Sequence, residues 1–329
     1  MKAFVLRAYG SPDQLDLADV DTPVPAAHEV LVRVRATSVN PYDWHHLRGE
    51  PRIARVMPGT LGLRAPKLRI LGCDLAGQVE AVGQGVTEFR PGDDVFALLE
   101  HGGGFAEYVS VPERLLARKP ANLSYEQAAA VPMAAVTALL GLRDVGRIEP
   151  GQKVLVNGAS GGIGTFAVQI ARALGAGADA VCSAPNADLV RSVGADNVTD
   201  YAKEDFTRSG PRYDVLLDVA GSRPVSACRR VLVPRGTLVL IGGPAGRWLQ
   251  PAGHMFASLA RGPLVSQRIA MADTVACPAK KQILTALTTL IEDGKVTPVI
   301  SRTYPFHDIR KAVRYQEQGH VPGKIAVTI

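Results

Sequence analysis

Cysteine is scarce in this sequence, and its spacing excludes two classes of protein. There are four cysteines, all far apart, and no Cys-x-x-Cys pair occurs: Cys73, Cys182, Cys228 and Cys277. Disulfide-rich secreted domains and zinc fingers both require cysteines at short, regular spacings. The sequence therefore predicts neither a disulfide framework nor a zinc finger.

Long apolar runs are also missing. The most apolar stretch, residues 128–142, contains Pro132 and Gly141 and is too short to cross about 30 Å of hydrocarbon. Residues 1–6 read as a short strand and do not supply the apolar core of about 7–15 residues that a signal peptide needs. We therefore expect a soluble, cytoplasmic protein that has no membrane partner.

Charge of one sign is not concentrated in a long run. The sequence has 37 Lys and Arg against 31 Asp and Glu, a net charge of +6, which gives no reason to expect a nucleic-acid partner. One loop, residues 48–69, is basic and has only Glu50 opposing its charge. Such a loop could attract an anionic substrate, but the general composition favours a solvated loop.

The sequence has two parts with different residue patterns. At about 150 residues per domain, 329 residues correspond to about two domains. Up to about residue 122, alternating segments such as 30–36, 77–83 and 105–111 lie between Gly and Pro turns and predict a small β-rich domain. From about residue 125, apolar strands alternate with helical segments, which predicts an α/β fold with a doubly wound parallel sheet. Near the end we expect a helix at 306–319 and a strand at 323–329 that pairs with the N-terminal domain.

A glycine-rich turn follows the predicted strand at 153–157 and opens a helix. Aligned on the dinucleotide fingerprint Gly-x-Gly-x-x-Gly, the turn reads Ala159-x-Gly161-x-x-Gly164. The second glycine of this fingerprint lets the backbone approach a pyrophosphate, the third lets the helix pack on the strand, and the helix N-terminus offers free N–H groups. The sequence therefore predicts a dinucleotide site made by Ala159, Ser160, Gly161, Gly162, Ile163 and Gly164.

The same turn fits a second pattern. The residues around Ser160 match the Gly-x-Ser-x-Gly elbow of α/β-hydrolases, and residues 101–104 match an oxyanion-hole His-Gly-Gly-Gly. Asp218 and His254 complete the chain order Ser, Asp, His. Against this reading, Gly164 has no role in an elbow, and the N-terminal part of the chain does not read as the start of a hydrolase sheet. A serine esterase that uses Ser160 is therefore the alternative function.

The type of cofactor depends on the charge that follows the next strand. NAD-binding proteins carry an acidic residue about 20 positions after the glycines, where it binds the ribose hydroxyls. The corresponding residue here is Ser183, and its neighbours are neutral. Ser183 and Asn186 could bind a 2′-phosphate, although no Arg or Lys lies on this loop. We predict NADPH as the cofactor, with NAD less favoured.

Several short motifs occur in one order, and together they are specific. They lie at residues 38–43, 71–77, 89–93, 103–108 and 319–324, with the glycine turn between the last two. With them the chain resembles, over nearly its whole length, the medium-chain dehydrogenase/reductase superfamily, nearest to its zinc-independent quinone-oxidoreductase-like branch. The resemblance implies a GroES-like catalytic domain at 1–124, completed by about 297–329, a Rossmann cofactor domain at 125–296, and a homodimer.

The resemblance also bears on metal binding. Alcohol dehydrogenases of the superfamily hold a catalytic zinc with Cys and His ligands, and the matching positions here are Asn40 and Cys73, the latter followed by Asp74. A catalytic zinc site needs three protein ligands and a water. The four-cysteine structural zinc loop has no counterpart, because no cysteine lies between Cys73 and Cys182. We expect no metal and an enzyme without catalytic zinc.

Zinc-free members of the branch reduce conjugated carbonyls, so the resemblance implies hydride transfer to the β-carbon of a quinone or an α,β-unsaturated carbonyl. Charge then develops on the carbonyl oxygen, which needs a hydrogen-bond donor or a proton. The candidate catalytic residues are Tyr42 as proton donor, Asn40 as a positioning group and Asp43 as a residue that orders the loop. Asp43 could instead only cap the following helix. The tyrosine that some quinone reductases carry after this loop has no match near residues 49–51.

Further cofactor contacts follow from the resemblance by position. They are Thr137, Tyr201, Ala220, Ile241, Gly242, Gly243, Val265, His320, Val321 and Lys324. Two departures weaken the expected hold on NADPH, because close relatives often have Arg where Pro185 and Pro322 stand.

The sequence contains no motif that identifies the substrate. Loops at 44–69 and 244–262 are expected to line its pocket, and Trp248, Met255 and Phe256 suggest an apolar acceptor. A third class of function also stays open, a cofactor-binding protein whose enzymatic activity is vestigial.

Overall fold

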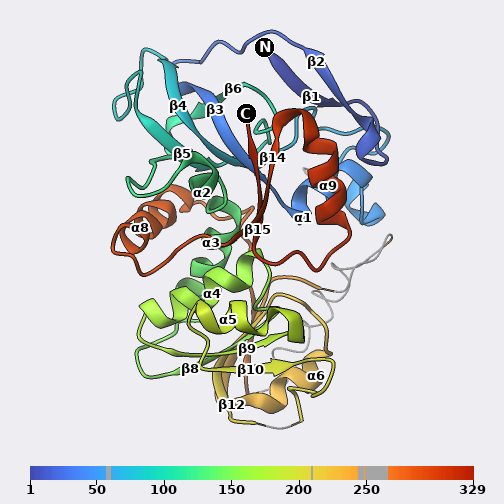
Figure 1. The fold of residues 1–329 in the computed structure, drawn as a ribbon, viewed down its shortest axis with the longest axis vertical. Helices are drawn as coiled ribbons and strands as arrows, with labels where there is room; N and C mark the ends of the chain where they lie inside the picture. The colour runs from blue at the N-terminus through green and yellow to red at the C-terminus, as the bar shows by residue number, and fades with distance from the viewer. Residues whose placement is uncertain (57–60, 209, 244–247, 249–265) are drawn as a thin grey trace. The chain divides into compact units, whose positions relative to one another are not determined.

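The chain forms two compact units (Figure 1). The computed structural model describes residues 1–56, 61–208, 210–243, 248 and 266–329. Unit 1 comprises Met1–Met133, Pro278–Glu292 and Pro298–Ile329, and unit 2 comprises Ala134–Cys277 and Asp293–Thr297. The sequence suggested a different division, with one domain at 1–124 and 297–329 and a second at 125–296. Those domain limits remain a proposal.

Unit 1 is built on β-sheet. Two strands, β1 (Lys2–Leu6) and β2 (Leu15–Asp19), pair antiparallel, and a separate seven-stranded sheet has the order β14-β15-β3-β4-β5-β7, with β6 paired to β3. The strands of this larger sheet are β3 (Glu29–Val39), β4 (Asp74–Val82), β5 (Asp94–Leu98), β6 (Tyr108–Pro112), β7 (Leu116–Arg118), β14 (Ile300–Pro305) and β15 (Lys324–Thr328). The helices of unit 1 are α1 (Pro41–Arg48), α2 (Tyr125–Ala129), α8 (Lys280–Glu292) and α9 (Ile309–Glu317).

The C-terminal strand pairs with the N-terminal part of the chain, as the sequence predicted. Strand β15 pairs antiparallel with β3, and Ile325 lies opposite Val39. Its apolar side chains join a core with Phe4 and Phe105, against which α9 also packs. The predicted helix at 306–319 is therefore present, although α9 begins at Ile309, after one 3-10 turn. This pairing brings the first residue of β15 to the end of β3, which matters for the site below.

Unit 2 contains one parallel six-stranded sheet, with the order β10-β9-β8-β11-β12-β13. In chain order this is 3-2-1-4-5-6, the order of a doubly wound dinucleotide-binding fold, and the predicted fold class is confirmed. The strands are β8 (Lys153–Asn157), β9 (Gly177–Cys182), β10 (Asn197–Asp200), β11 (Tyr213–Asp218), β12 (Leu232–Leu240) and β13 (Arg268–Met271). Among the residues of this unit that the structure describes, the α-helices are α3 (Pro132–Leu139), which starts at the end of unit 1, α4 (Gly162–Ala173), α5 (Ala187–Ser192) and α6 (Val225–Cys228). Within the described residues, no helix combines the length and the apolar character that a membrane span requires.

Candidate functional site

The glycine turn joins the carboxyl end of β8 to the start of α4. Gly158 adopts a left-handed conformation with φ of 90°, which an L side chain rarely adopts, and Ala159 is fully buried. Gly161 is the N-cap residue of α4, and its carbonyl accepts a hydrogen bond from the Thr165 N–H at 2.9 Å. The first N–H groups of α4 have no partner within the helix, so they are available to an anion.

Two glycines of the fingerprint have different surroundings. A Cβ at Gly164 would lie 2.2 Å from the carbonyl oxygen of Gly158, so this glycine lets the helix pack against the strand end. A Cβ at Gly161 would meet only the Gly158 oxygen, at 3.6 Å, and Gly161 has an ordinary φ of −77°. The positive φ of the turn therefore belongs to Gly158, while the space in front of Gly161 is open. The open space at Gly161 and the N–H groups of α4 fit a pyrophosphate. The dinucleotide role predicted for the turn is therefore compatible with its geometry.

Asn157 and Asp218 are hydrogen-bonded to each other at the ends of β8 and β11. The sequence did not indicate either residue as part of a cofactor site. Asn157 is buried, and its Nδ2 donates to Asp218 Oδ1 at 2.7 Å and to Ser222 Oγ at 3.2 Å. Asn157 and Asp218 lie opposite each other in the register of β8 and β11. The available signal was a polar residue closing an apolar strand, as in Val156-Asn157.

Four predicted cofactor residues lie at these same strand ends. Ala220 packs beside the turn, because a Cβ at Gly158 would lie 3.3 Å from the Ala220 Cβ. The N–H groups of Ile241 and Gly242 both donate to the Asp218 carbonyl, at 3.1 and 3.3 Å. A Cβ at Gly221 would lie 2.3 Å from the Cα of Gly243, so the loops after β11 and β12 are in close contact. The structure thus brings Ala220, Ile241, Gly242 and Gly243 together at the carboxyl edge of the sheet.

The predicted 2′-phosphate residues also converge. Asn186 Nδ2 donates to Ser160 Oγ at 3.3 Å and to Ser183 Oγ at 3.2 Å. Tyr201 directly follows β10, is 45% exposed, and its N–H donates to the Cys182 carbonyl at 3.2 Å. Two hydroxyls and an amide therefore meet beside the glycine turn, and each can bind a phosphate oxygen.

The remaining predicted cofactor positions have other surroundings. The buried Thr137 hydroxyl shares a hydrogen bond of 2.8 Å with Thr274. His320 is exposed with a positive φ of 58°, whereas Val321 packs in the core of unit 1 beside Val39. Val265 lies outside the described residues, as do His254, Met255, Phe256 and all of the predicted pocket loop at 244–262 except Trp248. A cofactor contact by Thr137, His320, Val321, Lys324 or Val265 stays a prediction.

The turn does not have the geometry of a hydrolase elbow. That elbow strains the backbone at its serine. Among the non-glycine residues that the structure describes, only Arg147, Arg235 and His320 have a positive φ, and Ser160 is not one of them. Asp218 already accepts hydrogen bonds from Asn157 and from the Gly221 N–H at 2.9 Å. The six parallel strands and the open face of Gly161 account for the turn without a nucleophile.

A second polar centre lies in unit 1, where three strands bring distant residues together. Asn40 follows β3, Asp74 begins β4 and Lys324 begins β15. All three are buried, with exposed fractions of 3%, 0% and 4%. Lys324 Nζ donates to Asn40 Oδ1 and, at 3.2 Å, to Asp74 Oδ2. Asn40 Nδ2 donates to the same Asp74 oxygen at 2.9 Å. We call these residues the Asn40 cluster.

Asp74 accepts hydrogen bonds from two further groups besides Lys324 and Asn40. Ser38 Oγ donates to Asp74 Oδ2, and the Met133 N–H donates to Asp74 Oδ1 at 2.7 Å. A fully buried carboxylate needs such partners, because an unpaired charge is costly to remove from water.

Asp43 has the capping role that sequence analysis gave as an alternative. It is the third residue of α1, and its Oδ2 accepts from the Asn40 N–H at 2.8 Å, so Asn40 rather than Asp43 is the N-cap residue. Its Oδ1 accepts from the Gly72 N–H at 2.9 Å, which orders the neighbouring loop. Burial is the main reason that the pKa of Asp43 is raised to about 7. A direct catalytic role for Asp43 stays a prediction.

Tyr42 and two histidines form one face of α1. The ring centroids of Tyr42 and His46 lie 4.0 Å apart. The Trp44 ring stacks on the His45 ring, with the two centroids 3.8 Å apart. Burial, together with the Cys73 thiol and the Asp43 carboxyl, raises the pKa of Tyr42 well above its ordinary value. Burial lowers the pKa of both histidines. Their Nδ1 atoms lie 3.0 Å from the Glu50 and Tyr42 carbonyls, so in the neutral rings Nδ1 carries the proton.

The two positions that match zinc ligands in alcohol dehydrogenases are in contact. Asn40 Nδ2 lies 3.3 Å from Cys73 Sγ, and Lys324 holds the other side of the Asn40 amide. Burial raises the pKa of the Cys73 thiol well above its ordinary value, so the sulfur stays protonated. Within the part of the chain that the structure describes, no group of three or more His, Cys, Asp or Glu could hold a metal ion.

Basic residues of the loop at 48–69 have structural partners. Arg48 Nε pairs with Glu317 Oε1 at 2.5 Å. Arg55 donates to the carbonyls of Gly49 and Arg48 at 2.7 and 2.8 Å and lies over the Tyr9 ring. These two arginines therefore anchor the loop rather than point at a ligand.

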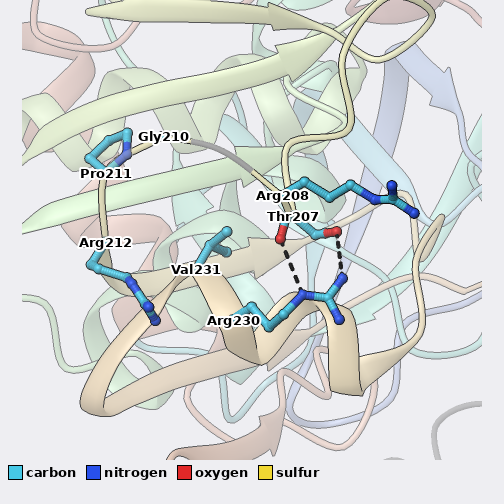
Figure 2. Close-up of a pocket in the computed structure, with 7 residues that line it drawn as sticks. All are labelled: Thr207, Arg208, Gly210, Pro211, Arg212, Arg230 and Val231. Atoms are coloured by element: carbon cyan, nitrogen blue, oxygen red, sulfur yellow. Dashed lines mark hydrogen bonds between the residues drawn. The ribbon is translucent and has the colours of Figure 1, made fainter.

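A cavity of about 550 Å³ lies in unit 2, and Figure 2 shows its lining. Its polar lining comes mainly from Arg208, Arg212 and Arg230, and the Arg230 guanidinium donates to the Thr207 carbonyl and hydroxyl at 3.3 Å. The cavity adjoins the first residues of β11 and β12, whereas the glycine turn follows the last residue of β8. Because these strands are parallel, the cavity lies at the opposite edge of the sheet from the predicted cofactor site.

Comparisons with known proteins cover the whole chain. Residues 26–121 match the family described as the alcohol dehydrogenase GroES-like domain, and residues 193–327 match the family described as zinc-binding dehydrogenase. The chain is 32% identical to the chloroplast envelope quinone oxidoreductase homolog of Arabidopsis thaliana, over 99% of this chain and 98% of that protein. It is 31% identical to the NADPH-dependent alkenal/one oxidoreductase of the same plant, over 99% and 79%. The crystal structure of the CurK enoyl reductase superposes with a TM-score of 0.86 at 28% identity, over 99% and 98%.

The sheet order of unit 2, the glycine turn with its open face, and full-length similarity at this level of identity all agree. The chain belongs to the medium-chain dehydrogenase/reductase superfamily, in its quinone-oxidoreductase-like branch.

Proposed function

We propose that this protein is an NADPH-dependent oxidoreductase that reduces a quinone or an α,β-unsaturated carbonyl without catalytic zinc. The observation that carries the proposal is the open backbone face at Gly161, in a chain similar along its full length to a quinone oxidoreductase homolog and to an alkenal/one oxidoreductase. A homodimer and a cytoplasmic location follow from the resemblance and from the sequence, and we propose them on that basis alone.

The cofactor would be held by backbone and hydroxyl groups. The N–H groups of Gly162 and Ile163, at the start of α4, would bind the pyrophosphate. Ser160, Ser183 and Asn186 would bind the 2′-phosphate. When bound, NADPH supplies a hydride for the β-carbon of the substrate. The protein has to orient the two partners and to stabilise charge on the carbonyl oxygen.

Tyr42 and Asn40 are the groups that we assign to this oxygen. The raised pKa of Tyr42 keeps its hydroxyl protonated at neutral pH, so it can donate a hydrogen bond as the oxygen becomes negative. We propose that Tyr42 donates a hydrogen bond to this oxygen and that the proton required by the product comes from solvent.

The Asn40 cluster supports metal independence. A zinc ion at this position would face an amide in place of a thiolate, a protonated thiol and the positive charge of Lys324. Simple ketones and alcohols react slowly without a Lewis acid, whereas a conjugated acceptor does not need one. The proposed substrates are therefore conjugated carbonyls rather than saturated ones.

The cofactor preference rests on Ser183, because a carboxylate there would repel a 2′-phosphate. In fluorescence titrations, NADPH is expected to bind more tightly than NADH, and Ser183→Asp is expected to reverse the order. Tighter binding of NADH by the wild-type protein would contradict the preference and leave the reductase proposal standing.

One experiment tests the reaction class. Oxidation of NADPH is followed with a panel of quinones and enones, with saturated ketones as controls, before and after treatment with a chelator. We expect turnover of conjugated acceptors that the chelator does not change. Loss of turnover that added zinc restores would contradict metal independence. NADPH binding without turnover of any acceptor would favour a vestigial enzyme.

A further inference from the structure

The Asn40 cluster fixes the direction of the Asn40 amide. An ammonium group can only donate hydrogen bonds, and a carboxylate can only accept them. Lys324 Nζ must therefore face the amide oxygen, and Asp74 Oδ2 must face the amide nitrogen, as observed. The reversed amide would place two donors together and two acceptors together in a buried site. The Lys324–Asp74 ion pair thus selects one orientation of a side chain whose two ends have similar shapes.

This arrangement leaves one N–H of Asn40 with a weak acceptor. One hydrogen of Nδ2 is directed to Asp74 at 2.9 Å. The other faces the protonated thiol of Cys73 at 3.3 Å, with Ser38 Oγ at 3.5 Å. A thiol sulfur accepts hydrogen bonds poorly compared with a carbonyl oxygen that is gaining negative charge. A substrate oxygen could therefore replace sulfur as the acceptor.

Lys324 also acts on the strength of this donor. Its hydrogen bond to Oδ1 withdraws electron density from the amide, and hydrogen bonds in such a chain strengthen one another. In a buried site this polarisation is less screened than in water. The ammonium therefore makes the second N–H of Asn40 a better donor without touching the substrate.

We propose that Lys324 is a positioning residue, which together with Asp74 orients and polarises the Asn40 amide so that its second N–H stabilises the developing oxyanion. This proposal rests on the proposed function and adds the group that makes Asn40 effective. The competing explanation is structural, namely that Lys324 only fastens β15 to β3 and β4.

A double-mutant cycle separates the two explanations. Lys324→Met is compared with wild type and, in parallel, Asn40→Ala/Lys324→Met is compared with Asn40→Ala. If Lys324 acts through Asn40, Lys324→Met lowers kcat about 100-fold in the wild-type background, the size expected for loss of an oxyanion donor. It causes no further loss in the Asn40→Ala background. Because Lys324 is also a predicted cofactor contact, the NADPH dissociation constant is measured for every variant, and a loss confined to this constant would overturn the proposal. An equal loss of kcat in both backgrounds would overturn the proposal.

Two additions keep the cycle interpretable. Where Lys324→Met does not fold, Lys324→Met/Asp74→Asn replaces it, because this variant leaves no unpaired buried charge. The control is Lys311→Met, which removes an exposed ion pair with Asp308 on α9 and is expected to leave kcat unchanged.

A readout that does not depend on activity separates this proposal from the proposed function. In protein labelled with [15N]asparagine, the side-chain amide signals of Asn40 are identified by their loss in Asn40→Ala. We expect slowly exchanging amide protons in the wild type and fast exchange in Lys324→Met. Unchanged exchange would overturn the orienting role of Lys324. A wild-type protein with slow exchange but no turnover of any acceptor would overturn the proposed function and leave the orientation intact.

Discussion

The glycine turn and the Asn40 cluster differ in how their parts are brought together. The turn is one continuous segment, residues 157–164, and its properties come from backbone conformation and from space without side chains. The Asn40 cluster joins Asn40 to Lys324, which are 284 residues apart, and its properties come from buried charge. Added volume should therefore damage the turn, whereas an unpaired charge should damage the cluster.

The largest effect is expected from breaking the ion pair of the cluster. Lys324→Met leaves the Asp74 carboxylate buried without its cation, so we expect the free energy of unfolding to fall by about 3–5 kcal/mol. Lys324→Met/Asp74→Asn removes both charges and should be more stable than the single variant. Urea unfolding of the three proteins measures this. If the double variant were the less stable one, the cluster would not owe its stability to charge pairing.

The next effect distinguishes two glycines of the turn. Gly164→Ala would place a Cβ 2.2 Å from a backbone oxygen and is expected to cost about 3 kcal/mol of unfolding free energy. Gly161→Ala is the matched control for stability, because its φ is ordinary and its nearest contact would be 3.6 Å away. We expect that control to change stability by less than about 1 kcal/mol. Equal losses in urea unfolding would show that the two glycines do not have separate roles.

A larger side chain at the open glycine should affect binding rather than folding. Gly161→Val is expected to keep its melting temperature and to weaken NADPH binding about 100-fold, which is the loss of one or two hydrogen bonds to a charged phosphate. Fluorescence titration and thermal unfolding of the same sample test this. Unchanged NADPH affinity in a folded Gly161→Val would falsify the assignment of the turn to a dinucleotide.

The smallest effect, taken per pH unit, concerns Asp43 beside the cluster. Its pKa is raised from 3.8 to about 7, so between these values the folded protein keeps a proton that the unfolded chain has lost. The free energy of unfolding therefore contains a contribution that falls as pH rises through this range, by at most about 1.4 kcal/mol per pH unit. We expect Asp43→Asn to remove this contribution, so that its stability declines less with pH than that of the wild type. Parallel profiles for the two proteins would contradict it.

The sequence predicted the turn because every part of it is local. A strand, a glycine spacing and a helix are continuous in the chain, so the pattern identified Gly161 and Gly164 before their surroundings were known. The pattern could not show that the positive φ belongs to Gly158, because that depends on the path of the backbone into α4. Asn157 was missed because a polar residue at a strand end has many explanations until Asp218 is found opposite.

The cluster could be predicted only in part. Asn40 and Cys73 stood out because they occupy positions where relatives carry zinc ligands, and the resemblance placed Lys324 near the cofactor. Nothing in the sequence indicates that Lys324 and Asp74 pair, because their contact depends on the order β15-β3-β4 of the sheet. The same limit applies to Val321, whose packing in a core was not indicated by its motif.

Hydride transfer to a conjugated carbonyl can be followed directly with an isotope. The purified protein is supplied with NADPH that carries deuterium at both positions of the reactive ring carbon and with an enone in ordinary water, and the product is analysed by NMR. We predict one deuterium at the β-carbon and a proton from solvent at the α-carbon. A product with deuterium at the carbonyl carbon, or no deuterated product although the protein binds NADPH, would contradict hydride transfer to the β-carbon.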